Sequence, residues 1–96
     1  MIVKLDHIQI AAPPGSEDEA KRFYGDLLGL DPITKPDELA DRGGVWFRVG
    51  GQEVHIGIDP DFRPATKAHP AFRAADRAAL DLLIRQLTEA GHPVEW

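Results

Sequence analysis

Residues 5–10, Leu-Asp-His-Ile-Gln-Ile, alternate between apolar and polar side chains near the start of the chain. Side chains of a β-strand point to opposite faces with period two. The segment therefore predicts a strand that places Ile8 and Ile10 on one face and His7 and Gln9 on the other. Because the apolar face of such a strand packs against a core, His7 is expected on the face away from the core.

Two later segments also place a histidine in the polar phase of the alternation. In residues 53–58, Glu-Val-His-Ile-Gly-Ile, this residue is His55. In residues 69–74, His-Pro-Ala-Phe-Arg-Ala, it is His69, with Phe72 in the apolar phase. If the three strands lie in one sheet, three imidazoles share one face. Imidazole is the commonest metal ligand among side chains, so three of them converging on one surface can make a metal site.

A helix is predicted after the first strand. Ser16 and Glu19 have the spacing of a capping box, in which Ser16 accepts a hydrogen bond from the amide of Glu19. An apolar stripe with helical spacing follows, and Gly29 supplies the left-handed stop. The stripe consists of Ala20, Phe23, Tyr24, Leu27 and Leu28.

Three more strands and a second helix are predicted further along. Residues 31–35 indicate a short edge strand, because Pro32 limits pairing. Residues 45–49 and 52–58 indicate two strands joined by a Gly-Gly turn. The second helix has Asp76 as its cap, Gly91 as its stop and an apolar stripe of Leu80, Leu83, Ile84 and Leu87.

The order of the elements repeats along the chain. His69 follows His7 by 62 residues, and Gly91 follows Gly29 by the same 62, whereas the helical stripes match at an offset of 60. The ends of the unit therefore repeat, while the link between strand and helix differs in length.

This repeat predicts one domain over residues 1–96. A first strand–helix–strand–strand–strand unit covers residues 1–59, a linker covers 60–68, and a partial second unit covers 69–96. The second unit stops two strands short, since only its second strand begins at residues 94–96, so we expect a missing C-terminal piece or a partner chain that completes the sheet. An open edge there favours a homodimer, because proteins usually cover unpaired strand edges.

Composition narrows the classes of partner. The 96 residues carry a net charge of -5, and the 11 basic residues are scattered, which argues against nucleic acid as a partner. No apolar run approaches the roughly 20 residues of a membrane span, so no membrane partner is expected. The absence of cysteine excludes disulfides and thiolate chemistry. A cytoplasmic enzyme fits these observations.

Four segments of the chain together resemble a known family. They are Leu5-Asp6-His7-Ile8, the helix from Phe23-Tyr24 through Leu28-Gly29-Leu30, Glu53-Val54-His55-Ile56, and the restart His69-Pro70-Ala71-Phe72 followed by Leu87 through Gly91. With them the chain resembles the glyoxalase I, bleomycin-resistance and extradiol-dioxygenase superfamily, the vicinal oxygen chelate proteins, over essentially its whole length. The resemblance implies an α+β fold. Two paired βαβββ units would form a curved, incomplete barrel with the helices on its convex face, the second unit being truncated.

The resemblance also implies a divalent metal ion, with zinc, nickel, manganese and iron all compatible with imidazole ligands. His7, His55 and His69 match the first three ligand positions of the family, and the fourth, usually a glutamate in the last strand, has no counterpart. His55 stands where many members carry glutamate or glutamine. The rival interpretation of each histidine is a hydrogen bond to a neighbour in place of a metal. His92 follows the glycine stop and is interpreted as a solvated turn residue.

Other polar residues are candidates for contact with a substrate. Trp46 and Arg48 share the polar phase of their strand, where Arg48 would hold a carboxylate or phosphate. Their rival interpretation is a surface Trp-Arg stack. Glu53 is a candidate catalytic base or else a solvated edge charge. Gln9 and Arg73 are further candidates for substrate binding.

The function predicted from these residues is a metal-dependent enzyme acting on a small molecule, of lyase, isomerase or dioxygenase type. The metal would take two substrate oxygens and act as a Lewis acid. The alternative is a non-catalytic small-molecule binder of the bleomycin-resistance type, with walls from Trp46, Phe62 and Trp96. A third interpretation is a structural or regulatory domain that keeps only the scaffold.

Overall fold

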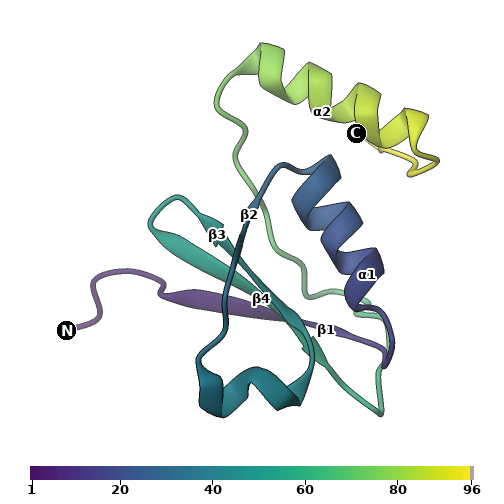
Figure 1. The fold of residues 1–96 in the computed structure, drawn as a ribbon. Helices are drawn as coiled ribbons and strands as arrows, with labels where there is room; N and C mark the ends of the chain where they lie inside the picture. The colour runs from purple at the N-terminus through teal and green to yellow at the C-terminus, as the bar shows by residue number, and fades with distance from the viewer. Residues whose placement is uncertain (96) are drawn as a thin grey trace. The chain divides into compact units, whose positions relative to one another are not determined.

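The computed structural model describes residues 1–95 of the chain (Figure 1). The chain divides into two compact units, Met1–Arg63 and the part that begins at Pro64. Within the described residues, no helix combines the length and the apolar character that crossing a membrane requires.

The first unit is built on a curved, unclosed sheet of four strands, and its fold class is α+β, as predicted. The strands are β1 (His7–Ala12), β2 (Asp31–Ile33), β3 (Val45–Val49) and β4 (Gln52–Ile58). Their order in the sheet is β1-β4-β3-β2. β1 runs parallel to β4, and the other two pairs are antiparallel. The short strand β2 lies at an edge, where a proline costs no ladder hydrogen bond.

One face of this sheet carries the core of the first unit. Phe47, Val54 and Ile56 are almost completely buried there, together with Ala20 from the helix. Burying a side chain of this size stabilises the fold by roughly 1.5–3 kcal/mol. The partly buried residues packed around them are Ile8, Ile10, Ala12, Tyr24, Leu30, Val45 and Val49. The predicted apolar phases of β1, β3 and β4 are therefore confirmed.

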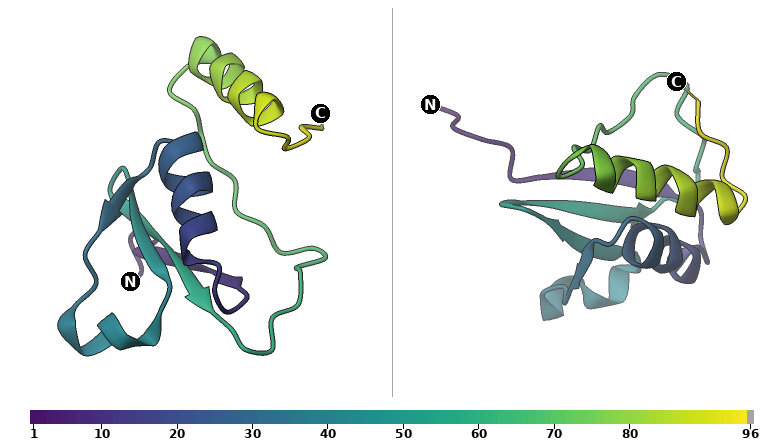
Figure 2. Two further views of the ribbon diagram at one scale, coloured as in Figure 1. Left: turned by 45° about the vertical axis from the view of Figure 1, so that its right-hand side comes forward. Right: turned by 90° about the horizontal axis from the view of Figure 1, so that it is seen from above.

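The helix between β1 and β2 begins as α1 (Glu17–Ala20) and continues as the π-helix η1 (Lys21–Leu27) (Figure 2). It ends before Gly29, whose φ of 74° is the predicted left-handed stop. The predicted capping box is wrong. The Ser16 hydroxyl donates to the carbonyl oxygen of Pro13 at 2.6 Å and makes no bond to the helix amides. The Pro13-Pro14-Gly15 turn brings that carbonyl close enough to compete for the hydroxyl.

The connection between β2 and β3 contains the short 3-10 helix η2 (Asp37–Arg42). Lys35 Nζ donates to the carbonyl oxygen of Gly43, which ties the two ends of this connection together. Gly44 then passes very close to β4, because a Cβ built on it would lie 2.2 Å from the carbonyl oxygen of Ile56. The connection is therefore held against the sheet and not free of it.

The described part of the second unit contains one element, the helix α2 (Arg77–Glu89). Its predicted cap is confirmed, since Oδ1 of Asp76 accepts a hydrogen bond from the amide of Ala79 at 2.8 Å. Gly91, with a φ of 89°, follows the end of the helix as predicted. The expected place of this helix on the convex face of the sheet remains a prediction.

The strand predicted over residues 69–74 is not formed, because these residues have neither helical nor strand structure. A strand is stable only when a neighbour completes its hydrogen-bond ladder, and the described residues of this unit contain no other strand. Pro70 removes one donor in addition. Val94 and Glu95 of the predicted last strand are likewise not in a strand, and Trp96 lies outside the described residues.

Candidate functional site on the polar face of the sheet

Three aromatic rings from neighbouring strands form a stack on the face opposite the core. Register places Trp46 beside His55 across β3 and β4, and β1 flanks β4 on its other side. The ring centroids of Trp46 and His55 are 3.7 Å apart with 2° between the planes. Those of His55 and His7 are 4.3 Å apart with 13° between the planes. His55 is buried at 6% exposure, while the side chain of His7 is 48% exposed.

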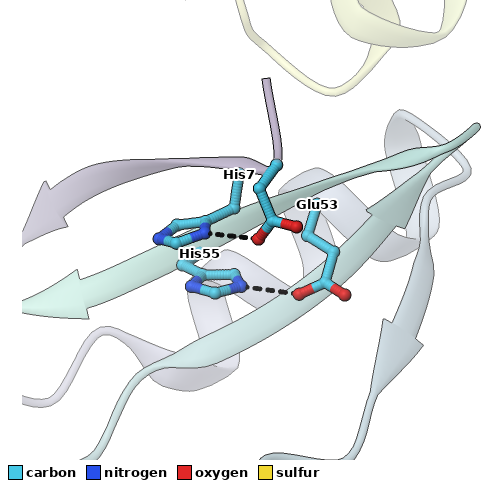
Figure 3. A network of polar contacts seen from close by, with 4 residues as sticks. His7, Glu53 and His55 are labelled. Carbon is cyan, nitrogen blue, oxygen red and sulfur yellow. Dashed lines mark hydrogen bonds and ion pairs between the residues drawn. The ribbon is translucent and has the colours of Figure 1, made fainter. Parts of the chain in front are cut away.

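Each histidine of the stack has a carboxylate on one ring nitrogen (Figure 3). Nδ1 of His7 lies 2.9 Å from Oδ2 of Asp6, and Nε2 of His55 lies 2.8 Å from Oε1 of Glu53. The hydrogen bond from His7 lowers the pKa of the exposed Asp6 carboxyl below its usual value. A carboxylate acceptor keeps the proton on the nitrogen that faces it, which leaves the lone pair on the other nitrogen.

The lone pairs therefore belong to Nε2 of His7 and Nδ1 of His55. Figure 3 shows both atoms on the side of the rings away from the two carboxylates. Asp6 can reach His7 because it lies just before the first residue of β1. Its side chain therefore need not point to the face opposite His7, as that of a neighbouring strand residue would. Glu53 reaches His55 because residues two apart in β4 share a face.

Gln9 and Arg48 flank this stack. Gln9 is the register partner of His55, and its amide covers Gly57, where a Cβ would lie 2.7 Å from Cδ of Gln9. Arg48 is exposed and lies in register between Asp31 on β2 and Glu53 on β4. Both residues lie on the predicted face, and their contact with a substrate remains a prediction.

His69 and Arg73 belong to the second unit and are exposed. Nδ1 of His69 donates to the carbonyl oxygen of Lys67 at 2.8 Å, so its lone pair is on Nε2. The sequence expected both residues on a strand of the same sheet as His7, and that strand is absent among residues 1–95. That His69 and His7 meet at one ion therefore remains a prediction.

The donor chemistry of the individual histidines fits a metal ion. In His7 and His69 alike, an oxygen holds Nδ1 and leaves Nε2 as the donor atom, which is the usual arrangement of a metal-ligating histidine. No group of three or more His, Cys, Asp or Glu side chains within residues 1–95 is placed to hold a metal together. A complete ligand set would need donors beyond those that lie together here.

Two features of this site were not predicted from the sequence. The sequence pattern assigned no role to Asp6, although its place next to His7 is a signal for a carboxylate that accepts a hydrogen bond from the imidazole. The stack of Trp46 on His55 was not foreseen. Alternation determines the face on which a side chain lies, but the ring orientation depends on χ angles that the pattern does not encode.

Comparison with known proteins places this chain in a family. Residues 4–95 match the model of the Glyoxalase/Bleomycin resistance protein/Dioxygenase superfamily. The chain belongs to this superfamily. The resemblance seen in the sequence is thereby confirmed. No curated protein sequence matches the chain.

Solved structures of the glyoxalase family agree with this assignment. A glyoxalase family protein from Bacillus anthracis is 46% identical, with a TM-score of 0.85 over 95% of this chain and 72% of that protein. A lactoylglutathione lyase from Agrobacterium tumefaciens shares the fold at 22% identity, with a TM-score of 0.68 over the full chain and 76% of the lyase. The fosfomycin resistance protein FosX from Listeria monocytogenes, in complex with Mn(II) and a dihydroxypropylphosphonic acid, shares it at 17% identity. Its TM-score is 0.71 over the full chain and 75% of FosX.

Proposed function

We propose that this member of the glyoxalase superfamily is a divalent-metal-dependent enzyme that acts on a small molecule, with lyase, isomerase or dioxygenase chemistry. One observation carries the proposal most directly. Nδ1 of His7 is held by the Asp6 carboxylate, and Nε2 has no hydrogen-bond partner among residues 1–95. The Mn(II) complex of FosX supports a divalent ion in this fold.

In this proposal His7 and His69 are metal ligands, and the ion is zinc, nickel, manganese or iron. When bound, the ion would supply Lewis-acid stabilisation of negative charge on substrate oxygens. The sequence assigned a ligand role to His55 as well, and that role stays a prediction. A carboxylate would complete the ligand set in addition to the histidines, because imidazole and carboxylate are both common ligands of these ions.

The remaining predicted residues take roles around the ion. Trp46 and Gln9 would line the substrate site, and Arg48 and Arg73 would bind an anionic group of the substrate. Glu53 was predicted as a catalytic base. Its Oε1 is bonded to His55, so a role as base requires either the other carboxylate oxygen or a break in that bond.

A non-catalytic small-molecule binder is the second candidate function. The observation that favours it is the column of aromatic rings formed by Trp46, His55 and His7, because stacked rings offer a wall for a flat ligand without any metal. Under either function we propose a homodimer located in the cytoplasm, with a small molecule as ligand and neither nucleic acid nor membrane as partner.

Zinc titration of the parent chain and of two variants tests the enzyme proposal. The variants His7→Ala and His69→Ala should each lose zinc affinity by at least tenfold, because a site with few ligands depends on every one. His92→Ala is the control, since His92 lies outside the proposed site, and it should bind as the parent does. If both ligand variants bind zinc like the parent, the histidines are structural. That result would favour the non-catalytic small-molecule binder over the enzyme.

A further inference from the structure

We propose that His55 is not a metal ligand but the positioning residue of His7. In this proposal the Trp46–His55 pair, anchored by Glu53, is a platform that holds the His7 ring with its Nε2 directed at the ion. The inference rests on the proposed function, because it assumes that His7 binds a metal. It departs from the ligand set that the sequence suggested.

The geometry of the stack prevents both histidines from ligating one ion in this arrangement. The lone pair of an imidazole nitrogen lies in the plane of its ring, so a ligated metal lies in or near that plane. The rings of His7 and His55 are within 13° of parallel, and their centroids are 4.3 Å apart. An ion in the plane of one ring would lie farther from the plane of the other than the 2.0–2.1 Å of a metal–nitrogen bond, at about the stacking separation.

His55 is also the histidine whose position is already determined by the protein. It is 6% exposed, it lies between two rings, and Nε2 is bonded to Oε1 of Glu53 at 2.8 Å. Reorienting it toward an ion would break that hydrogen bond and the contact with Trp46, whose ring is nearly parallel at 3.7 Å. Removing the partner of a buried polar group is costly, because nothing then compensates for the loss of water around that group.

His7 has the opposite properties. Its side chain is about half exposed, and its polar partner Asp6 is 86% exposed, so the pair alone would leave the ring mobile. The face of His55 supplies the missing constraint, because it removes the rotation of the His7 ring that metal binding would otherwise have to freeze. Restricting a ligand in its bound orientation raises affinity by lowering the entropy lost on binding. Trp46 in turn supports the far face of His55.

The test is zinc affinity in the full chain with two substitutions at one position. His55→Phe removes both ring nitrogens and keeps a flat ring between Trp46 and His7. His55→Ala removes the ring as well. We expect His55→Phe to bind zinc within about threefold of the parent, and His55→Ala to bind about tenfold more weakly, as loss of an orienting partner typically weakens a site by about 10–100-fold. Far-ultraviolet circular dichroism establishes that each variant is folded.

The result that overturns the proposal is a loss in His55→Phe as large as that in His7→Ala, since His55 would then be a ligand. Equal binding by His55→Ala and the parent would also overturn it, because the platform would have no effect. If His7→Ala binds zinc like the parent, the proposed function fails, and that outcome is separate from the comparison at His55.

A measurement on the parent chain avoids any effect of the substitutions on folding. Long-range proton–nitrogen spectra of the histidine rings report each ring nitrogen separately. On addition of zinc, the resonance of Nε2 of His7 should shift strongly, whereas Nδ1 and Nε2 of His55 should keep their tautomeric pattern. A metal-type shift at Nδ1 of His55 would contradict the proposal.

Discussion

At the scale of single residues, Gly44 occupies a place with no room for a side chain. Its φ is 85°, and a Cβ would lie 2.2 Å from the carbonyl oxygen of Ile56. We expect Gly44→Ala to lower the free energy of unfolding by more than about 2 kcal/mol, because it adds backbone strain to a clash with β4. The measurement is urea denaturation followed by circular dichroism.

Gly51→Ala is the matched control for this substitution. Gly51 lies in the β3–β4 turn with no atom within 4 Å of an added Cβ and no left-handed φ. Its effect should be within about 0.5 kcal/mol. Similar stabilities of the two variants would show that the connection before β3 can move away from the sheet.

Tyr24 is the only tyrosine of the chain, so its titration can be followed without interference. Its ring packs against Phe47, and burial raises the pKa of its hydroxyl above the usual value of 10.0. The folded state therefore keeps the proton longer than the unfolded state does. Stability is fully present below pH 10.0 and falls as pH rises from there toward the higher folded pKa. Ultraviolet absorbance of tyrosinate measures the titration, and Tyr24→Phe should remove this part of the pH dependence.

The polar site shows how far single residues could be predicted. Period-two alternation correctly placed His7 and His55 on the face opposite the core. It could not indicate that Trp46 and His55 stack, because that contact depends on side-chain rotamers and on strand register. Alternation also could not show whether His7 and His69 lie close together. The two residues belong to different units, and their spacing in the sequence does not determine the distance between their side chains.

At the scale of elements, the cap of α2 gives a local test. Asp76→Ala removes the hydrogen bond that the Ala79 amide donates to Oδ1 of Asp76, and should cost about 1 kcal/mol of helix stability. Asp81→Ala is the control, because it breaks only the exposed i,i+4 pair with Arg77, worth about 0.3–0.5 kcal/mol. Thermal melting of the helical circular dichroism signal measures both. Equal losses of stability in the two variants would mean that the capping hydrogen bond contributes no more than an exposed ion pair.

Elements whose signals are local were predicted well, and those that need distant partners were not. The strands of the first unit and the two glycine stops follow from alternation and from φ values that favour glycine. The segment over residues 69–74 had the alternation of a strand but has no strand to pair with among the described residues of its unit. The capping box at Ser16 failed because a nearer acceptor, the carbonyl of Pro13, takes its hydroxyl.

At the scale of the whole molecule, an apolar segment precedes the edge strand β1. Its exposed large side chains are Met1, Ile2, Val3 and Leu5. Exposed apolar side chains next to an open strand edge favour association, so we expect a homodimer in sedimentation at high micromolar concentration. Val3→Lys should shift the equilibrium toward monomer, whereas Leu82→Lys on α2 should not. A parent chain that stays monomeric would contradict this expectation.

The metal content of the purified parent chain tests the proposed function most directly, with His7→Ala prepared in the same way beside it. A metal-dependent enzyme held by His7 predicts a transition metal at about one ion per parent chain and almost none in the variant. A parent chain free of transition metal after growth with zinc, nickel, manganese and iron supplied, or a variant that carries as much metal as the parent, would contradict it.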